Sequence, residues 1–121
     1  MAPSTSSDCL FCKIVAGEVP STEVLSTDRA YAFRDIAPQA PVHVLFVPKS
    51  DIATLDDLRP QHAEVISRLV LAAAEYARRE GLAEDGYRVV INCNADAGQT
   101  VFQLHLHLLA GAPLGRFGTP R

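Results

Sequence analysis

The residues most suited to chemistry lie near the end of the chain, where residues 101–108 read Val-Phe-Gln-Leu-His-Leu-His-Leu. Polar and apolar residues alternate from Gln103 to Leu108, which is typical of a β-strand with one buried face. The alternation directs the three leucines toward a core. It places Gln103, His105 and His107 on the opposite face, each about 6.6 Å from the next.

Two imidazoles on one strand face indicate proton transfer, nucleophilic attack or metal binding, because histidine titrates near neutral pH and is a common metal ligand. The preceding loop contains Gly98-Gln99-Thr100, whose backbone N–H groups and hydroxyl suit an anion. The alternative is a solvated amphipathic strand after a plain hairpin loop. His43 interrupts the apolar run 42–47, where a hydrogen-bonded core histidine is the other interpretation.

Two further features allow more than one interpretation. Cys9 and Cys12 form a Cys-x-x-Cys motif, which fits half of a zinc site, a redox pair, or two small buried residues of a helix. Asp35 follows Phe33-Arg34 and is suited either to accept hydrogen bonds from a ribose or to cap a turn.

The elements that must position these residues alternate between short strands and helices, which favours an α+β fold. We expect strands at 22–25, 30–33, 42–47, 87–92 and 101–108, a short helix at 9–16 capped by Asp8, and a long helix at 61–80. The apolar stripe predicted for the long helix consists of Val65, Ile66, Leu69, Val70, Ala73 and Ala77.

Length and composition predict one soluble cytoplasmic domain. The chain has 121 residues, a hydrophobic fraction of 48% and a net charge of −3, which give no reason to expect nucleic acid or a membrane as a partner. It lacks a signal-peptide pattern, and three cysteines do not make a disulfide framework. We expect a disordered lead at 1–8, a domain at 9–111 and an irregular tail at 112–121.

Several segments in the right order resemble the HIT (histidine triad) superfamily, in particular its Hint branch. They read Cys-Leu-Phe-Cys-Lys-Ile at 9–14, Ala-Phe-Arg-Asp-Ile at 32–36 and Pro-Gln-Ala-Pro-Val-His-Val-Leu-Phe-Val-Pro-Lys at 38–49. Tyr-Arg-Val-Val-Ile-Asn at 87–92 and Gly-Gln-Thr-Val-Phe-Gln-Leu-His-Leu-His-Leu-Leu at 98–109 complete the match. The resemblance implies a HIT-like fold, namely a five-stranded antiparallel sheet with one long and one short helix, in a homodimer.

The resemblance also assigns roles. It makes His105 the nucleophile, His107 a phosphate contact and His43 the residue that supports proton transfer. Phosphate and leaving-group contacts fall on Asn92, Gln99 and Thr100. The nucleoside pocket falls on Asp35, which would bind the ribose, and on Leu10, Phe11, Ile14, Phe33 and Ile36.

The chain departs from the family pattern at Gln103, which stands where the family has the first histidine of the triad. Many bacterial members with Cys-x-x-Cys complete a zinc site with that histidine and with one that follows Pro-Lys-x. Asp51 holds the second position here, so both imidazole ligands are missing and we expect no metal. The tail also lacks the Trp-Pro-Pro stretch of many relatives, so specificity that depends on it does not carry over.

The function implied is hydrolysis of purine nucleoside 5′-phosphoramidates, or of related α-substituted nucleotides, through a nucleotidyl-histidine and without a cofactor. A dinucleoside polyphosphate hydrolase is one alternative. A non-catalytic nucleotide-binding or interaction protein is the other, because one triad member is replaced.

Overall fold

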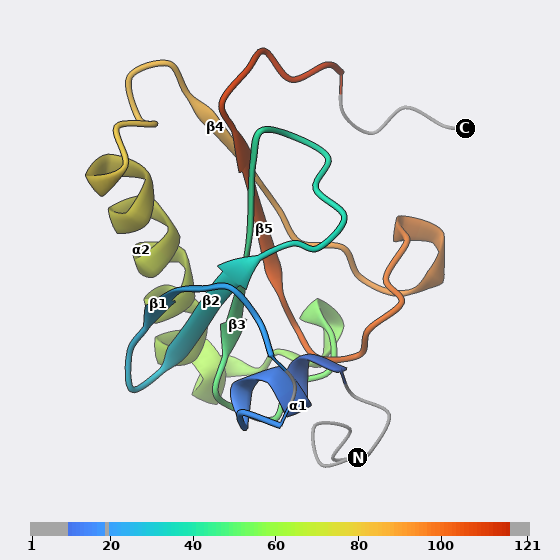
Figure 1. Ribbon diagram of the computed structural model, residues 1–121. Helices are drawn as coiled ribbons and strands as arrows, with labels where there is room; N and C mark the ends of the chain where they lie inside the picture. The colour runs from blue at the N-terminus through green and yellow to red at the C-terminus, as the bar shows by residue number, and fades with distance from the viewer. Residues whose placement is uncertain (1–9, 19, 117–121) are drawn as a thin grey trace.

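The computed structural model of the protein describes residues 10–18 and 20–116. Its helices and strands are α1 (Leu10–Val15), β1 (Glu23–Ser26), β2 (Ala30–Arg34), β3 (Val42–Pro48), α2 (Ala63–Arg79), β4 (Tyr87–Val90) and β5 (Leu106–Ala110) (Figure 1). Short 3-10 helices at Leu55–Asp57, Pro60–His62 and Ala95–Ala97 lie in the connections. The predicted lead at 1–8 with its Asp8 cap, Cys9, and the tail beyond residue 116 lie outside the described residues.

The strands form one antiparallel sheet in the order β1-β2-β3-β5-β4. Strand β3 is central and pairs with β2 on one side and β5 on the other. This arrangement confirms the expected α+β fold with a five-stranded antiparallel sheet, one long helix and one short helix. No helix in the described part of the chain is long and apolar enough to cross a membrane.

Helix α2 covers one face of the sheet and buries Leu69, Ala73 and Ala77 as predicted. Val70 is 47% exposed, so its place in the predicted stripe is wrong. The buried residues also include Ala72 and Tyr76, which centres the stripe near Leu69. At 100° per residue Val70 then lies about 90° from that centre, at the edge of the contact with the sheet.

The opposite face of the sheet carries the second apolar cluster, formed with helix α1. Its buried members are Phe11, Ile14, Phe33, Leu45 and Val47. Because side chains alternate along a strand, His43 lies on the same face as Leu45, and the pairing of Leu45 with His107 brings the second histidine there too.

The strand predicted at 101–108 is shorter than expected, because β5 begins only at Leu106. The leucines at 104, 106 and 108 are buried as predicted. Gln103 and His105, which the alternation placed on an open face, are buried as well, with exposed fractions of 3% and 8%. The alternation identifies two faces but not what covers the second one, which here includes α1 and the segment after β3.

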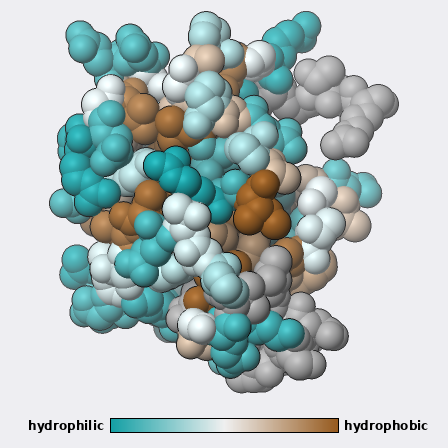
Figure 2. All heavy atoms as spheres, viewed as in Figure 1, coloured by the Kyte–Doolittle hydropathy of each residue, from teal (hydrophilic) through white to brown (hydrophobic). Residues whose placement is uncertain are grey.

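Apolar side chains are not confined to the two clusters. Figure 2 shows a face on which hydrophobic and hydrophilic side chains are interspersed. Among the described residues, the large hydrophobic side chains that remain exposed are Ile36, Leu55, Val70, Leu71, Tyr87, Val89 and Phe102.

Candidate active site

The ring of His105 is held on two sides. Its Nδ1 lies 2.8 Å from the backbone carbonyl oxygen of Gln103, and the Phe11 ring packs against it edge to face with centroids 4.6 Å apart. A carbonyl oxygen only accepts hydrogen bonds, so Nδ1 must carry the proton. The Nε2 atom of a neutral His105 therefore keeps its lone pair, which is the form that a nucleophile requires.

The ring of His43 is oriented by the loop between β2 and β3. The backbone N–H of Gln39 donates to His43 Nδ1 at 3.0 Å, and the backbone N–H of Asp35 donates to the His43 carbonyl at 3.0 Å. Because Nδ1 accepts, the ring proton of His43 lies on Nε2. That atom is 2.9 Å from His107 Nδ1 and 3.4 Å from an Asp35 carboxylate oxygen.

The direction of this hydrogen bond also determines which ring nitrogen of His107 carries the proton. When His43 Nε2–H donates to His107 Nδ1, the neutral His107 carries its proton on Nε2. The rings of His105 and His107 lie side by side, with centroids 5.0 Å apart. The site thus combines an imidazole lone pair on His105 with an imidazole N–H on His107, which suits attack on an anion whose charge the N–H stabilises.

Burial keeps these rings neutral. It lowers the pKa of His105 and of His43, and the carboxylate of Asp35 partly opposes both shifts. Burial, followed by the neighbouring His105 and His43, lowers the pKa of His107 to about 4. All three imidazoles are therefore neutral at neutral pH, each with a proton on one ring nitrogen only.

The side chain of Gln99, which is only 5% exposed, connects parts of the loop before β5 through hydrogen bonds. Its side-chain amide donates to the carbonyls of Ala53 and Val101, and its side-chain oxygen accepts the N–H of Asn94. The predicted phosphate contact of Gln99 would thus come from its backbone or from a rearranged side chain. Asn92 is half-buried and Thr100 is exposed at the same loop.

The predicted nucleoside residues are only partly brought together. Phe11 and Phe33 pack edge to face at 5.5 Å, and Ile14 is buried in the same cluster, whereas Ile36 is 92% exposed. Asp35 accepts the N–H of Ala37, which confirms its turn-capping role, and its other oxygen faces His43. The side chain of Leu10 lies outside the described part of the structure.

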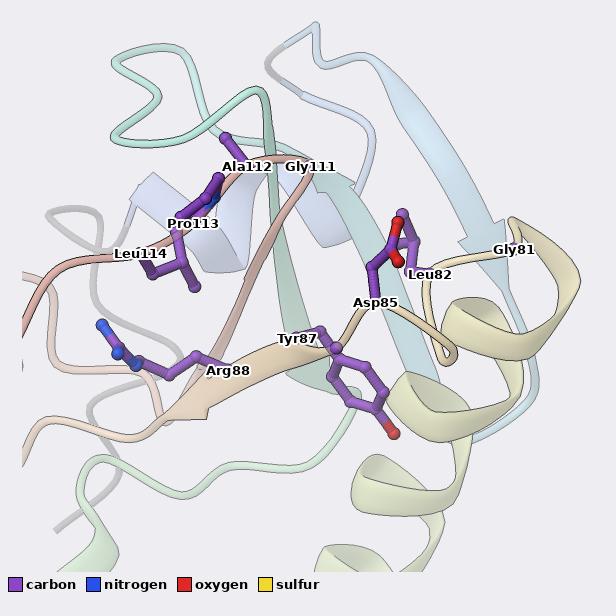
Figure 3. A pocket seen from close by; sticks show the side chains of 10 residues that line it. Gly81, Leu82, Asp85, Tyr87, Arg88, Gly111, Ala112, Pro113 and Leu114 are labelled. Atoms are coloured by element: carbon purple, nitrogen blue, oxygen red, sulfur yellow. The ribbon is translucent and has the colours of Figure 1, made fainter.

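A cavity of about 720 Å³ lies elsewhere, between the end of α2, strand β4 and the segment after β5 (Figure 3). Gly81, Leu82, Asp85, Gly86, Tyr87, Arg88, Gly111, Ala112, Pro113 and Leu114 line it. None of the predicted site residues is among them. This cavity is therefore separate from the group formed by His43, His105 and His107.

Comparison with known proteins assigns the chain to a family. The model of the HIT domain matches residues 16–114, which is most of the chain. The chain belongs to the HIT domain family. It is 45% identical over 108 residues to the purine nucleoside phosphoramidase of Escherichia coli K12, covering 89% of this chain and 91% of that protein. It is 41% identical over 112 residues to the adenylylsulfatase HINT1 of Arabidopsis thaliana, covering 91% and 76%.

Solved HIT structures agree with the fold. A histidine triad protein from Clostridium difficile superposes with a TM-score of 0.88 at 41% identity, covering 93% of this chain and 97% of that one. A HIT family hydrolase from Legionella pneumophila Philadelphia 1 gives 0.87 at 46% identity, covering 89% and 96%. The protein is therefore a HIT-family hydrolase with the α+β HIT fold.

Three features of this HIT site were not found from the sequence. The N–H of Gln39 and the carbonyl of Gln103 are backbone groups, which no residue type or sequence motif identifies. The contact of Phe11 with His105 links the predicted nucleoside pocket to the predicted nucleophile, and only the position of Phe11 in the Cys-x-x-Cys segment could have suggested it.

A cation does not suit the histidine group. Ligand atoms of Asp35, His43 and His107 lie within 4.8 Å of one another, which is close enough for three ligands of one ion. His43 Nδ1, however, accepts the N–H of Gln39, so its proton occupies the nitrogen that would bind the metal. A metal-bound histidine normally donates its other N–H to an acceptor, and here that position faces a donor.

The zinc site that the family resemblance implies does not fit the described residues either. The Gln103 amide donates to the carbonyls of Pro48 and Ser50, so it presents hydrogens there instead of a lone pair. Asp51, at the other ligand position, is exposed. Cys9 and the side chain of Cys12 lie outside the described part.

Protein purified without added metal is expected to contain far less than one zinc ion per chain, because an amide at Gln103 and an exposed carboxylate at Asp51 replace the two imidazole ligands. Elemental analysis measures this directly. Dialysis against a chelator should leave the thermal midpoint unchanged. One tightly held zinc ion per chain would contradict the expectation.

The pKa of His107 predicts how stability depends on pH. The folded-state pKa of about 4 lies below the ordinary value of 6.5, so the unfolded chain takes up this proton first as the pH falls. The stabilisation is fully present above about pH 6.5 and is lost as the pH falls toward 4. NMR titration of the imidazole signals gives the His107 midpoint, and a midpoint at or above 6.5 would refute the assignment.

Proposed function

We propose that the protein, as a Hint-like member of the family, hydrolyses purine nucleoside 5′-phosphoramidates or related α-substituted nucleotides to the nucleoside monophosphate. The observation that carries the proposal is the buried His105, whose Nδ1 is tied to a carbonyl and whose Nε2 is left with a lone pair. The name of the Escherichia coli relative supports the substrate class. The name of the Arabidopsis relative, an adenylylsulfatase, supports the proposal that the site also accepts other leaving groups on the α-phosphorus.

In the first step, the lone pair of His105 Nε2 forms a bond to the α-phosphorus, and the bond from phosphorus to the leaving amine breaks. The amine nitrogen departs with the bonding electron pair and takes up one proton. His107 Nε2–H is placed to interact with the phosphoryl oxygens or with the leaving nitrogen, since the two rings are adjacent. His43 fixes the His107 tautomer throughout.

In the second step, water attacks the same phosphorus and the bond to His105 Nε2 breaks, returning the electron pair to the ring. One proton is released to solvent, which balances the one taken up by the amine. The products are the amine and the nucleoside monophosphate. Two moderate barriers replace one direct displacement by water.

The remaining predicted residues bind the substrate. Asp35 would accept hydrogen bonds from the ribose, next to the apolar side chains of Leu10, Phe11, Ile14, Phe33 and Ile36. Asn92, Thr100 and the backbone at Gln99 would contact the phosphate or the leaving group. A purine nucleotide is thus the expected small-molecule partner, and no metal or cofactor takes part in either step.

Replacing His105 by alanine is expected to lower kcat on a fluorogenic adenosine phosphoramidate by about 10³-fold or more, because the nucleophile is lost. AMP binding, measured by calorimetry, should change little. His62→Ala is the matched control, since His62 lies in the 3-10 helix before α2 and not in the site.

The same assay separates the alternatives. Wild-type protein that binds AMP but turns over no substrate would identify a binding module. Faster turnover of a diadenosine polyphosphate than of the phosphoramidate would favour the dinucleoside polyphosphate class. A His105→Ala variant that keeps its activity within tenfold would refute the nucleotidyl-histidine.

We also propose that the protein is a homodimer. Strand β4 is an edge of the sheet and exposes the apolar side chains of Tyr87 and Val89. An edge strand that exposes apolar side chains is a surface that proteins normally cover. Pairing of two such edges would join the two sheets of a dimer.

Sedimentation equilibrium should therefore give twice the chain mass of 13.1 kDa. Val89→Asp is expected to shift the protein toward the monomer, because a charge would be buried at the edge. Thr22→Asp, beside the opposite edge of the sheet, adds the same charge and should leave the dimer intact. A wild-type protein that is monomeric at micromolar concentration would contradict the proposal.

A further inference from the structure

The side chain of Gln103, two residues before the proposed nucleophile His105, is hydrogen-bonded to the backbone of another segment. Its side-chain amide nitrogen lies 2.8 Å from the Ser50 carbonyl and 3.1 Å from the Pro48 carbonyl, and the residue is almost fully buried. Both amide hydrogens thus have a backbone acceptor in the segment where β3 ends.

The backbone around Gln103 is not part of the hydrogen-bonded sheet. Strand β5 begins at Leu106, so residues 103–105 lie before the hydrogen-bonded ladder. The N–H of Leu104 donates to the Ile52 carbonyl at 2.7 Å. That bond and the two bonds of the Gln103 amide connect residues 103–104 to the segment 48–52.

The carbonyl of the same residue accepts the Nδ1–H of His105 at 2.8 Å. Where this carbonyl lies therefore decides which nitrogen of His105 carries the proton and how the ring is turned. Phe11 packs against the ring but offers no hydrogen bond, so it cannot choose between the tautomers.

We propose that the Gln103 side chain is a positioning residue for His105. By binding the Pro48 and Ser50 carbonyls, it holds its own backbone carbonyl where that carbonyl accepts the His105 Nδ1–H and leaves Nε2 free. The effect on turnover rests on the proposed function, whereas the effect on the His105 tautomer does not.

Two variants test the proposal. Gln103→Met keeps the length of the side chain and removes both donors. Gln103→His keeps a donor at the same reach, because Nε2 of either side chain is three bonds from Cβ. Gln61→Met, on the exposed 3-10 helix before α2, is the matched control for a glutamine-to-methionine change.

In Gln103→Met we expect kcat to fall by about 10-fold to 100-fold, the range known for residues that orient metal-binding histidines through hydrogen bonds, with KM changed less than about 3-fold. Gln103→His should stay within about tenfold of wild type. Imidazole nitrogen NMR of the resting protein should show one His105 tautomer in wild type, in Gln103→His and in Gln61→Met, and a mixture in Gln103→Met.

The tautomer measurement separates positioning from general stability. A Gln103→Met protein with a lowered thermal midpoint but a single Nδ1–H tautomer would overturn the proposal, as would an unchanged kcat. If wild-type protein hydrolyses none of the substrates, the proposed function fails, and the tautomer comparison still decides the role of Gln103.

Discussion

The protonation of the histidine group is decided by two backbone groups, one at each end. The Gln39 N–H can only donate and the Gln103 carbonyl can only accept, so each fixes one ring nitrogen of the histidine that it touches. The hydrogen bond between His43 and His107 then transmits the choice to the third ring. Two adjacent imidazoles thus take opposite roles, one with a lone pair and one with a hydrogen, while the Asp35 carboxylate lies 3.4 Å from His43 Nε2.

This arrangement depends on the centre of the sheet. His43 and His107 lie on β3 and β5, whose register pairs His43 with Leu109 and Leu45 with His107. The two histidines are thus diagonal neighbours on one face, a separation that long polar side chains can bridge. The loop between β2 and β3 returns to His43 through Asp35 and Gln39, so the hairpin that builds the core also orients the ring.

The sequence predicted those features of the fold and the site that depend on the type of a side chain and on its spacing along a strand or helix. Alternation located the buried leucines of residues 103–108, and a single polar residue within the apolar run 42–47 marked His43. It was uninformative where the backbone acts, as at Gln39. The sequence did not predict the burial of Gln103 and His105, because the alternation of polar and apolar residues shows which face of a strand a side chain lies on. It does not show which other segments of the chain cover that face. Val70 was misplaced for a related reason, since a helical stripe has edges that composition does not define.

The helix that covers His105 is the shorter of the two α-helices in the described part of the chain. Helix α1 has 6 residues, too few to be stable alone in water, and Phe11 and Ile14 are the described side chains that bury it against the sheet. A helix held by so few buried side chains is expected to open in local fluctuations that leave the rest of the domain folded. Water would then reach His105 and its pKa would rise toward the ordinary value. The reactivity of the ring is accordingly a property of local stability, which can change without any change in the stability of the whole domain.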